Sequence, residues 1–206
     1  MECELKYDLG DEAAYRKLLT SLGPADEELR QRNVYFDGGD TDGVLRLRSE
    51  TNGKTGEVEL FLTYKHRTAE PSESGNAYFK VEEYEVEIGE ADWQAIYQGQ
   101  IGESLWDLEP LARLAEKNGR DALPSVGEME NLRLVYSGIL PDGAVAEIDR
   151  TRFPGNREDF ELEVETENPD PVIAWLSQRF AELGLELRPQ AKTKYGRFKS
   201  CLKNLG

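Results

Sequence analysis

Apolar and polar residues alternate with a period of two through most of the chain, and this period is typical of β-strands with one buried face. Tight reversals are expected between several strands, because Pro141-Asp142-Gly143 and Pro154-Gly155-Asn156 supply residues that favour turns. Short connections of this kind predict antiparallel hairpins. The alternating segments are Glu2–Leu9, Asn33–Asp37, Val44–Ser49, Val58–Lys65, Tyr78–Ile88, Leu132–Leu140, Ala144–Phe153 and Phe160–Glu165.

Helical spacing of apolar residues interrupts the strands at four places. We expect Asp11 to cap a first helix that continues to Leu22, and a second helix to begin near Trp93. Leu105–Leu114 and Val172–Leu183 have similar spacing. A few helices beside many strands predict the α+β class with a dominant antiparallel sheet. The 206 residues contain no repeat or linker, so we expect a single domain over residues 1–206.

Composition narrows the possible partners and chemistries. The chain has 25 Lys and Arg against 41 Asp and Glu, a net charge of −16, which disfavours nucleic acid as a partner. We expect no signal peptide and no membrane partner, because there is no basic start before an apolar run and no stretch of about eighteen apolar residues. Two cysteines suggest no disulfide framework, so a cytoplasmic location is expected. The single histidine, His66, disfavours a His-rich zinc site and leaves carboxylates for metal or acid–base chemistry.

Rows of charge on single strand faces are the most unusual feature of the sequence, since side chains two residues apart share a face. A solvated outer face explains any one row, but the rows are sorted by sign although like charges on neighbouring strands repel. A hydrated barrel interior would accommodate them, with carboxylates holding a hard divalent cation and basic groups gripping phosphate oxygens. The rows are Glu2, Glu4 and Lys6; Arg46 and Arg48; Thr63 and Lys65; Glu83, Glu85 and Glu87; Glu147 and Asp149; Glu161, Glu163 and Glu165.

The N-terminal pattern Glu2-Cys3-Glu4-Leu5-Lys6 resembles the Glu-x-Glu-x-Lys strand of the triphosphate tunnel metalloenzymes, the CYTH superfamily. The resemblance is nearest to the plant-type inorganic tripolyphosphatases, from Gln31-Arg32-Asn33 and Glu130-Asn131-Leu132-Arg133. It implies an eight-stranded antiparallel β-barrel with flanking helices, whose tunnel holds a triphosphate. Further matches follow in family order: Leu45-Arg46-Leu47-Arg48, Thr63-Tyr64-Lys65, Val81-Glu82-Glu83-Tyr84-Glu85, Glu147-Ile148-Asp149, Phe160-Glu161-Leu162-Glu163-Val164-Glu165 and Thr193-Lys194-Tyr195.

The same resemblance implies a role for each site residue. The implied ligands of Mg²⁺ or Mn²⁺ are Glu2, Glu4, Glu163 and Glu165, and which two of Glu161, Glu163 and Glu165 reach the metal stays open. The implied catalytic residues, which position water, are Glu83, Glu85 and Asp149. The implied phosphate-binding residues are Lys6, Arg46, Arg48, Lys65, Arg133 and Lys194. Several relatives have lysine where this chain has Thr63, and Lys192, Arg197 or Lys199 could compensate, although we expect these three to be solvated.

These residues predict metal-dependent hydrolysis of a small triphosphate. The favoured reaction is hydrolysis of inorganic tripolyphosphate to diphosphate and phosphate. Thiamine triphosphatase, nucleoside triphosphatase and class IV-like adenylate cyclase are the alternatives within the family. A non-catalytic polyphosphate- or nucleotide-binding module and an acidic structural domain are alternatives of other classes. The sequence leaves both a monomer and a homodimer open.

Overall fold

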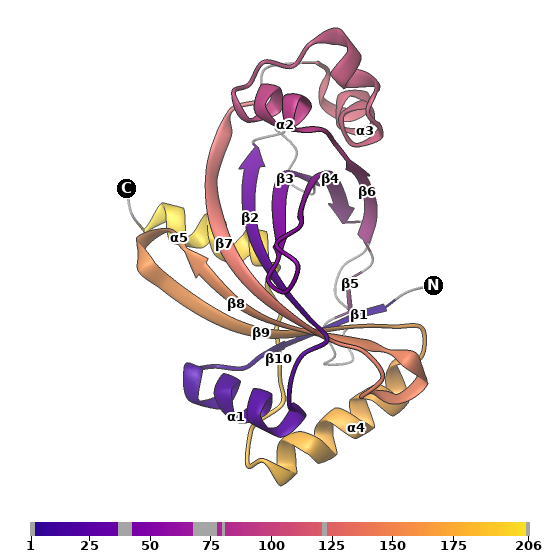
Figure 1. Ribbon diagram of the computed structural model, residues 1–206, viewed down its shortest axis with the longest axis vertical. Coiled ribbons are helices and arrows are strands. Elements are labelled where there is room, and N and C mark those ends of the chain that lie inside the picture. The colour runs from indigo at the N-terminus through magenta and orange to yellow at the C-terminus, as the bar shows by residue number, and fades with distance from the viewer. Residues whose placement is uncertain (1–2, 37–42, 68–77, 80, 121–122, 205–206) are drawn as a thin grey trace. The chain divides into compact units, whose positions relative to one another are not determined.

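The computed structural model describes residues 3–36, 43–67, 78–79, 81–120 and 123–204 (Figure 1). Within these residues the strands pair antiparallel, which confirms the antiparallel α+β class, and eight of the ten strands have six or more residues. The eight are β1 (Cys3–Asp8), β2 (Glu27–Phe36), β3 (Gly43–Asn52), β4 (Val58–Arg67), β6 (Val81–Glu87), β7 (Ser125–Tyr136), β8 (Val145–Phe153) and β9 (Arg157–Thr166). Two-residue strands, β5 (Tyr78–Phe79) and β10 (Arg188–Pro189), complete the set.

The chain divides into two compact units. Unit 1 consists of Met1–Leu29, Glu70–Lys80 and Asn131–Gly206, and unit 2 of Arg30–Ala69 and Val81–Glu130. The strands β2 and β7 each contribute residues to both units. The expectation of a single domain stays a prediction.

Unit 1 is a layer of strands with helices packed on its apolar face. Its strand order is β10-β1-β9-β8-β7, and β5 also pairs with β1. Leu5 and Ala146 both lie opposite Val164, so they share one face of the layer. Tyr15 and Leu18 of α1 (Glu12–Leu22) belong to the core on that face, as do apolar residues of α4 (Pro169–Glu182). Figure 1 shows α1 and α4 together on this side of the strands.

Local signals explain where the helices of unit 1 begin and end. Asp11 caps α1 as expected, because its carboxylate accepts a hydrogen bond of 2.8 Å from the amide of Ala14. Gly23 follows the helix with a φ of +82°, a conformation that glycine adopts without steric cost. A further helix, α5 (Lys194–Lys203), was not expected from the sequence; the hydroxyl of Thr193 caps it by accepting from the amide of Gly196 at 3.0 Å.

Unit 2 has the strand order β2-β3-β4-β6 and a core of its own. Its apolar face carries Leu47, Leu62 and Val86, which lie opposite one another on β3, β4 and β6. The helices that pack there are α2 (Glu90–Tyr97), the 3₁₀ helix η1 (Glu103–Asp107) and α3 (Glu109–Asn118). The single helix expected over Leu105–Leu114 is wrong: Leu108 is extended, and Pro110 lies in the first turn of α3, where its missing N–H costs nothing.

None of the helices in the described ranges combines the length and the apolar character needed to cross a membrane.

Candidate functional site

Charged side chains cover the face of unit 1 opposite its helix-packed core. In the strand register, Glu4 lies opposite Glu165 and Lys6 opposite Glu163 on β1 and β9. Glu147 likewise lies opposite Glu163 on β8. Residues directly opposite in an antiparallel pair share a face, so the rows expected from the alternation meet on one surface. We call this surface the charged face of unit 1; its described members are Glu4, Lys6, Arg133, Glu147, Asp149, Glu161, Glu163 and Glu165.

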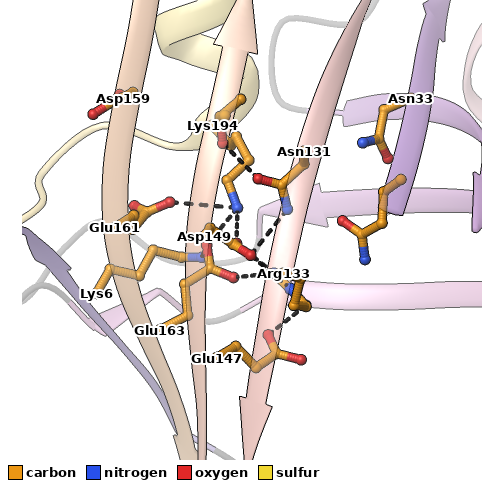
Figure 2. Close-up of polar contacts among 12 residues, drawn as sticks. Lys6, Asn33, Asn131, Arg133, Glu147, Asp149, Asp159, Glu161, Glu163 and Lys194 are labelled. Carbon is orange, nitrogen blue, oxygen red and sulfur yellow. Dashed lines mark hydrogen bonds and ion pairs between the residues drawn. The ribbon is translucent and has the colours of Figure 1, made fainter. Parts of the chain in front are cut away.

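Asp149 lies at the centre of this face and is fully buried. Its Oδ1 accepts hydrogen bonds from Asn131 Nδ2 and Arg133 Nε, both at 2.9 Å. Its Oδ2 accepts from Arg133 Nη2 at 2.7 Å and from the ammonium of Lys194 (Figure 2). Burial alone would raise the pKa of Asp149, but the charges of Arg133 and Lys194 hold that pKa below its ordinary value. Asp149 is therefore an ionised carboxylate whose roughly four acceptor positions all receive a donor.

Glu163 is the second buried anion of the face. Its carboxylate accepts from Lys6 at 2.7 Å, from Arg133 at 2.8 Å and from Lys194 at 3.3 Å. Although burial opposes ionisation, the charges of Lys194, Lys6 and Arg133 lower the pKa of Glu163 well below its ordinary value. Lys6 also donates to Glu4 at 2.7 Å. Three of the six predicted phosphate-binding residues therefore lie together on unit 1, each in contact with a carboxylate.

Glu161 has partners from α5, on the side of β9 away from the core. Arg197 Nη1 and Nη2 donate to its two carboxylate oxygens at 3.0 and 2.7 Å, and Lys194 lies 3.5 Å away. Burial and the neighbouring charge of Glu163 raise the pKa of Glu161, against the effect of Lys194. The expectation that Arg197 is solvated is wrong, since only 7% of its side chain is exposed.

Two further acidic residues lie at the edge of the face. Glu147 is half-buried and forms an ion pair with Arg133. Burial raises the pKa of Glu147 to about 7, with Arg133 acting in the opposite direction. Glu165 is exposed. Glu2, the first residue of the expected metal-binding set, lies outside the described residues.

The donor set on this face fits a hard divalent cation. Asp149, Glu161 and Glu163 each offer a carboxylate oxygen, and among the described residues these three oxygens lie within 4.8 Å of one another. Oxygen donors are what Mg²⁺ and Mn²⁺ prefer. Glu163 is common to this cluster and to the expected ligand set, whereas Glu4 lies beside it in contact with Lys6.

Unit 2 carries a charged face of its own, opposite its apolar core. Arg46, Thr63 and Glu85 lie side by side on β3, β4 and β6. The buried hydroxyl of Thr63 donates to Glu85 at 2.7 Å and accepts from Arg46 at 3.1 Å. Arg46 also reaches Glu85 at 3.3 Å. Thr63 therefore links an arginine to a glutamate on this face.

The other predicted cations of unit 2 are also paired. Lys65 forms an ion pair of 2.7 Å with Glu83, and Arg48 donates to the side-chain oxygen of Asn33 at 2.9 Å. Burial opposes ionisation of Glu83, but the charge of Lys65 lowers its pKa. We name Arg46, Arg48, Lys65, Glu83 and Glu85, with Thr63, the charged face of unit 2.

The sequence did not identify the neutral polar groups that support these charges. Asn131 donates to Asp149, and Thr151 donates to Asn131 at 2.8 Å; all three side chains are buried. Asn33 on β2 is buried in the same way. The signal that could have identified them is a neutral polar residue on the charged side of a strand. Such a residue, when buried, needs a hydrogen-bond partner among the charged side chains.

Antiparallel strands with one apolar and one densely charged face define the general class of this protein, an antiparallel α+β fold. The chain belongs to the CYTH domain family, which matches residues 1–198. CYTH domains are commonly metal-dependent triphosphatases or cyclases. Among proteins with curated descriptions, none matches the chain.

Solved structures support the same fold. A proposed adenylyl cyclase from Hippeastrum, HpAC1, is described as having a dominant triphosphatase activity; it is 25% identical, with a TM-score of 0.81 over 97% of this chain and 96% of that chain. A proposed adenylate cyclase from Bacillus halodurans is 19% identical, with a TM-score of 0.63 over 96% and 97% of the two chains. The protein PH1819 from Pyrococcus horikoshii is 20% identical, with a TM-score of 0.58 over 97% and 99%.

Proposed function

We propose that this protein hydrolyses a small triphosphate with the help of Mg²⁺ or Mn²⁺, and that its main substrate is inorganic tripolyphosphate. The main support is the charged face of unit 1, where Lys6, Arg133 and Lys194 lie among carboxylates at hydrogen-bonding distance. Membership of the CYTH family and the triphosphatase activity described for the Hippeastrum relative agree with it.

In the acidic cluster of Asp149, Glu161 and Glu163, the two glutamates would hold the divalent ion, with Glu4 next to them on β1. Such an ion, when bound, would neutralise phosphate charge and make a coordinated water more acidic. Lys194 contacts all three of these carboxylates, so the cluster also fixes the position of this lysine.

The cations of both charged faces would bind phosphate oxygens. Lys6, Arg133 and Lys194 each contact a carboxylate of unit 1, and a phosphate oxygen would offer them the same kind of charged acceptor. Because phosphoryl transfer depends mainly on positioning and charge neutralisation, these groups would supply most of the catalytic effect. Arg46, Arg48 and Lys65 would serve the same purpose on unit 2. The expected meeting of the two faces in one tunnel stays a prediction.

The carboxylates divide between two roles in this proposal. Asp149 receives donors at all its acceptor positions, so we assign Asp149 the role of orienting Arg133 and Lys194. Glu83 and Glu85 are each more than a third exposed, and they stay the candidates for orienting the attacking water. Such a carboxylate would contribute to catalysis by orienting the attacking water or accepting its proton, which requires it to lie within hydrogen-bonding distance of that water.

The test is phosphate release from tripolyphosphate, ATP and thiamine triphosphate, with Mg²⁺, with Mn²⁺ and with neither. We expect metal-dependent release that is fastest with tripolyphosphate, and a loss of about 100-fold in kcat/KM for Arg133→Met, the size of effect found when one charge-stabilising donor is removed. Arg120→Met is the matched control, because Arg120 is an exposed arginine paired with Glu103.

Two results would contradict the proposal. Conversion of ATP to cyclic AMP at a higher rate than tripolyphosphate hydrolysis would identify a cyclase. Tripolyphosphate binding without release of phosphate under any metal would identify a binding module.

A further inference from the structure

Two of the cations of helix α5, Lys194 and Arg197, lie one turn apart and close to the charged face of unit 1. Residues three apart on a helix lie on the same side. Lys194 is the first residue of α5, and its ammonium contacts Asp149, Glu163 and Glu161. Arg197 is buried, and no role in the proposed reaction has been assigned to it. The position of Lys194 therefore depends on how α5 is attached to the strands.

Arg197 makes that attachment. Its two terminal nitrogens donate to the two oxygens of Glu161 at 3.0 and 2.7 Å, and its Nε lies 2.7 Å from a carboxylate oxygen of Asp159. Both acidic residues belong to β9. Two-point contacts between a guanidinium and a carboxylate fix orientation as well as distance. Arg197 therefore holds α5 against β9 in one orientation.

The same guanidinium also fixes the chain just before the helix. Arg197 Nη1 donates to the backbone carbonyl of Lys192 at 2.7 Å. The hydroxyl of Thr193 caps the first turn by accepting from the amide of Gly196. Two hydrogen bonds within the segment from Lys192 to Arg197 therefore fix its conformation. Lysine has a long side chain with considerable rotamer freedom. A fixed backbone origin limits the volume that its ammonium can sample.

We infer that Arg197 is a positioning residue: by binding Glu161 and Asp159 it docks α5 on β9 and directs Lys194 to Asp149 and Glu163. The contact geometry stands by itself, while its consequence for turnover rests on the proposed triphosphatase function. Figure 2 shows Asp159, Glu161 and Lys194 along this side of β9.

Amine labelling followed by mass spectrometry tests the positioning role without any enzyme assay. Acetic anhydride would be applied to the wild type, Arg197→Met, Arg197→Lys and Lys203→Met, and the modification rate of Lys194 compared with that of Lys6. Lys6 is the internal reference because its partners, Glu4 and Glu163, lie on β1 and β9 and not on α5. Lys203 is exposed on the same helix, so its replacement removes an equal charge without touching the contact.

We expect Arg197→Met to raise the labelling rate of Lys194 about tenfold relative to Lys6, because local opening of a docked element exposes its own residues first. Arg197→Lys should give an intermediate rate, and Lys203→Met the wild-type rate. Equal increases for Lys6 and Lys194 would mean that Arg197 only stabilises the fold, and an unchanged rate for Lys194 would overturn the inference.

A second measurement separates this inference from the proposed function. With tripolyphosphate and Mg²⁺, Arg197→Met should lower kcat/KM about tenfold, because Lys194 is one of the cations proposed to bind the phosphates and neutralise their charge. Absence of hydrolysis by the wild type would contradict the proposed function alone, because the labelling result does not depend on it. A kcat/KM equal to that of the wild type would contradict the positioning role of Arg197 towards a substrate-binding lysine.

Discussion

At the scale of single residues, the buried charges are tolerated because each has a partner of opposite sign. Asp149 illustrates this, with donors from Asn131, Arg133 and Lys194 around one carboxylate. An unpaired charge in such a place costs several kcal/mol, and loss of one partner from a buried pair costs about 3–5 kcal/mol. Ion pairs at the exposed edge of a face contribute much less to the free energy of unfolding, because water screens their charges.

Glu83 offers a test of this difference through the pH dependence of stability. Lys65 lowers its pKa below the ordinary value of 4.5, so the folded state binds the proton less tightly than the unfolded state. The stabilising contribution is then complete above about pH 4.5 and is lost as the pH falls through the lower, folded-state pKa. Since 40% of the Glu83 side chain is exposed, we expect less than about 1 kcal/mol.

Urea denaturation of the wild type and Glu83→Gln at neutral pH and at progressively lower pH measures this contribution. The free energies of unfolding should differ by less than about 1 kcal/mol at neutral pH and converge under acid conditions. Glu57→Gln, at an exposed position between β3 and β4, is the control. A difference that grows on acidification would show that the sign of the shift is wrong.

At the scale of elements, period-two alternation was enough to predict which side chains share a face. The faces of β1, β8 and β9 follow from the alternation, because the strand pleat leaves no other arrangement. Strand ends were less predictable: β2 begins at Glu27 and β7 at Ser125, several residues before the apolar alternation starts. Backbone pairing continues there through residues whose side chains are mostly polar.

The helix α5 could not be predicted by the same reasoning. Gly196 lies in its first turn and lowers helix propensity. Its stability comes from contacts far away in the sequence, such as Arg197 with Glu161 and Lys194 with Asp149. No periodicity encodes which distant carboxylate a lysine will meet. For this reason the sequence placed Lys194 in the site by resemblance alone and treated Arg197 as solvated.

Thr193 is the residue on which the start of α5 depends most directly. Replacing this N-cap by alanine should lower the free energy of unfolding by about 1 kcal/mol, because the amide of Gly196 loses its acceptor. Thr193→Ser keeps the hydroxyl and should stay close to the wild type. Thermal or urea denaturation measures both variants, and equal stability of the alanine variant and the wild type would mean that the cap contributes nothing.

At the scale of the whole molecule, a net charge of −16 coexists with cations concentrated on two faces. Uniform acidity would repel a polyphosphate, whereas the buried Lys6 and the half-buried Arg133 can attract one locally. The alternation and the sorting of charge indicated this arrangement, and the family match agrees with it. The neutral residues that orient the charges, such as Asn131, became visible only with the contacts.

A ligand that binds the charged faces should stabilise the folded protein in proportion to its affinity. At 100 times its dissociation constant, tripolyphosphate with Mg²⁺ would add about 2.7 kcal/mol, which for a chain of this size is a rise of roughly 5–10 °C in Tm. Tripolyphosphate with EDTA should give a smaller rise, because the acidic cluster would then repel the phosphates it faces.

Differential scanning fluorimetry at constant ionic strength distinguishes this binding from a general salt effect. Sulfate at matched ionic strength is the control, since it carries negative charge without a chain of phosphates to span several cations. Specific binding predicts that Arg133→Met loses most of the rise while the exposed Arg120→Met keeps it. An equal rise with sulfate would mean that the cations of these faces respond to any anion, and the case for a triphosphate as ligand would then fail.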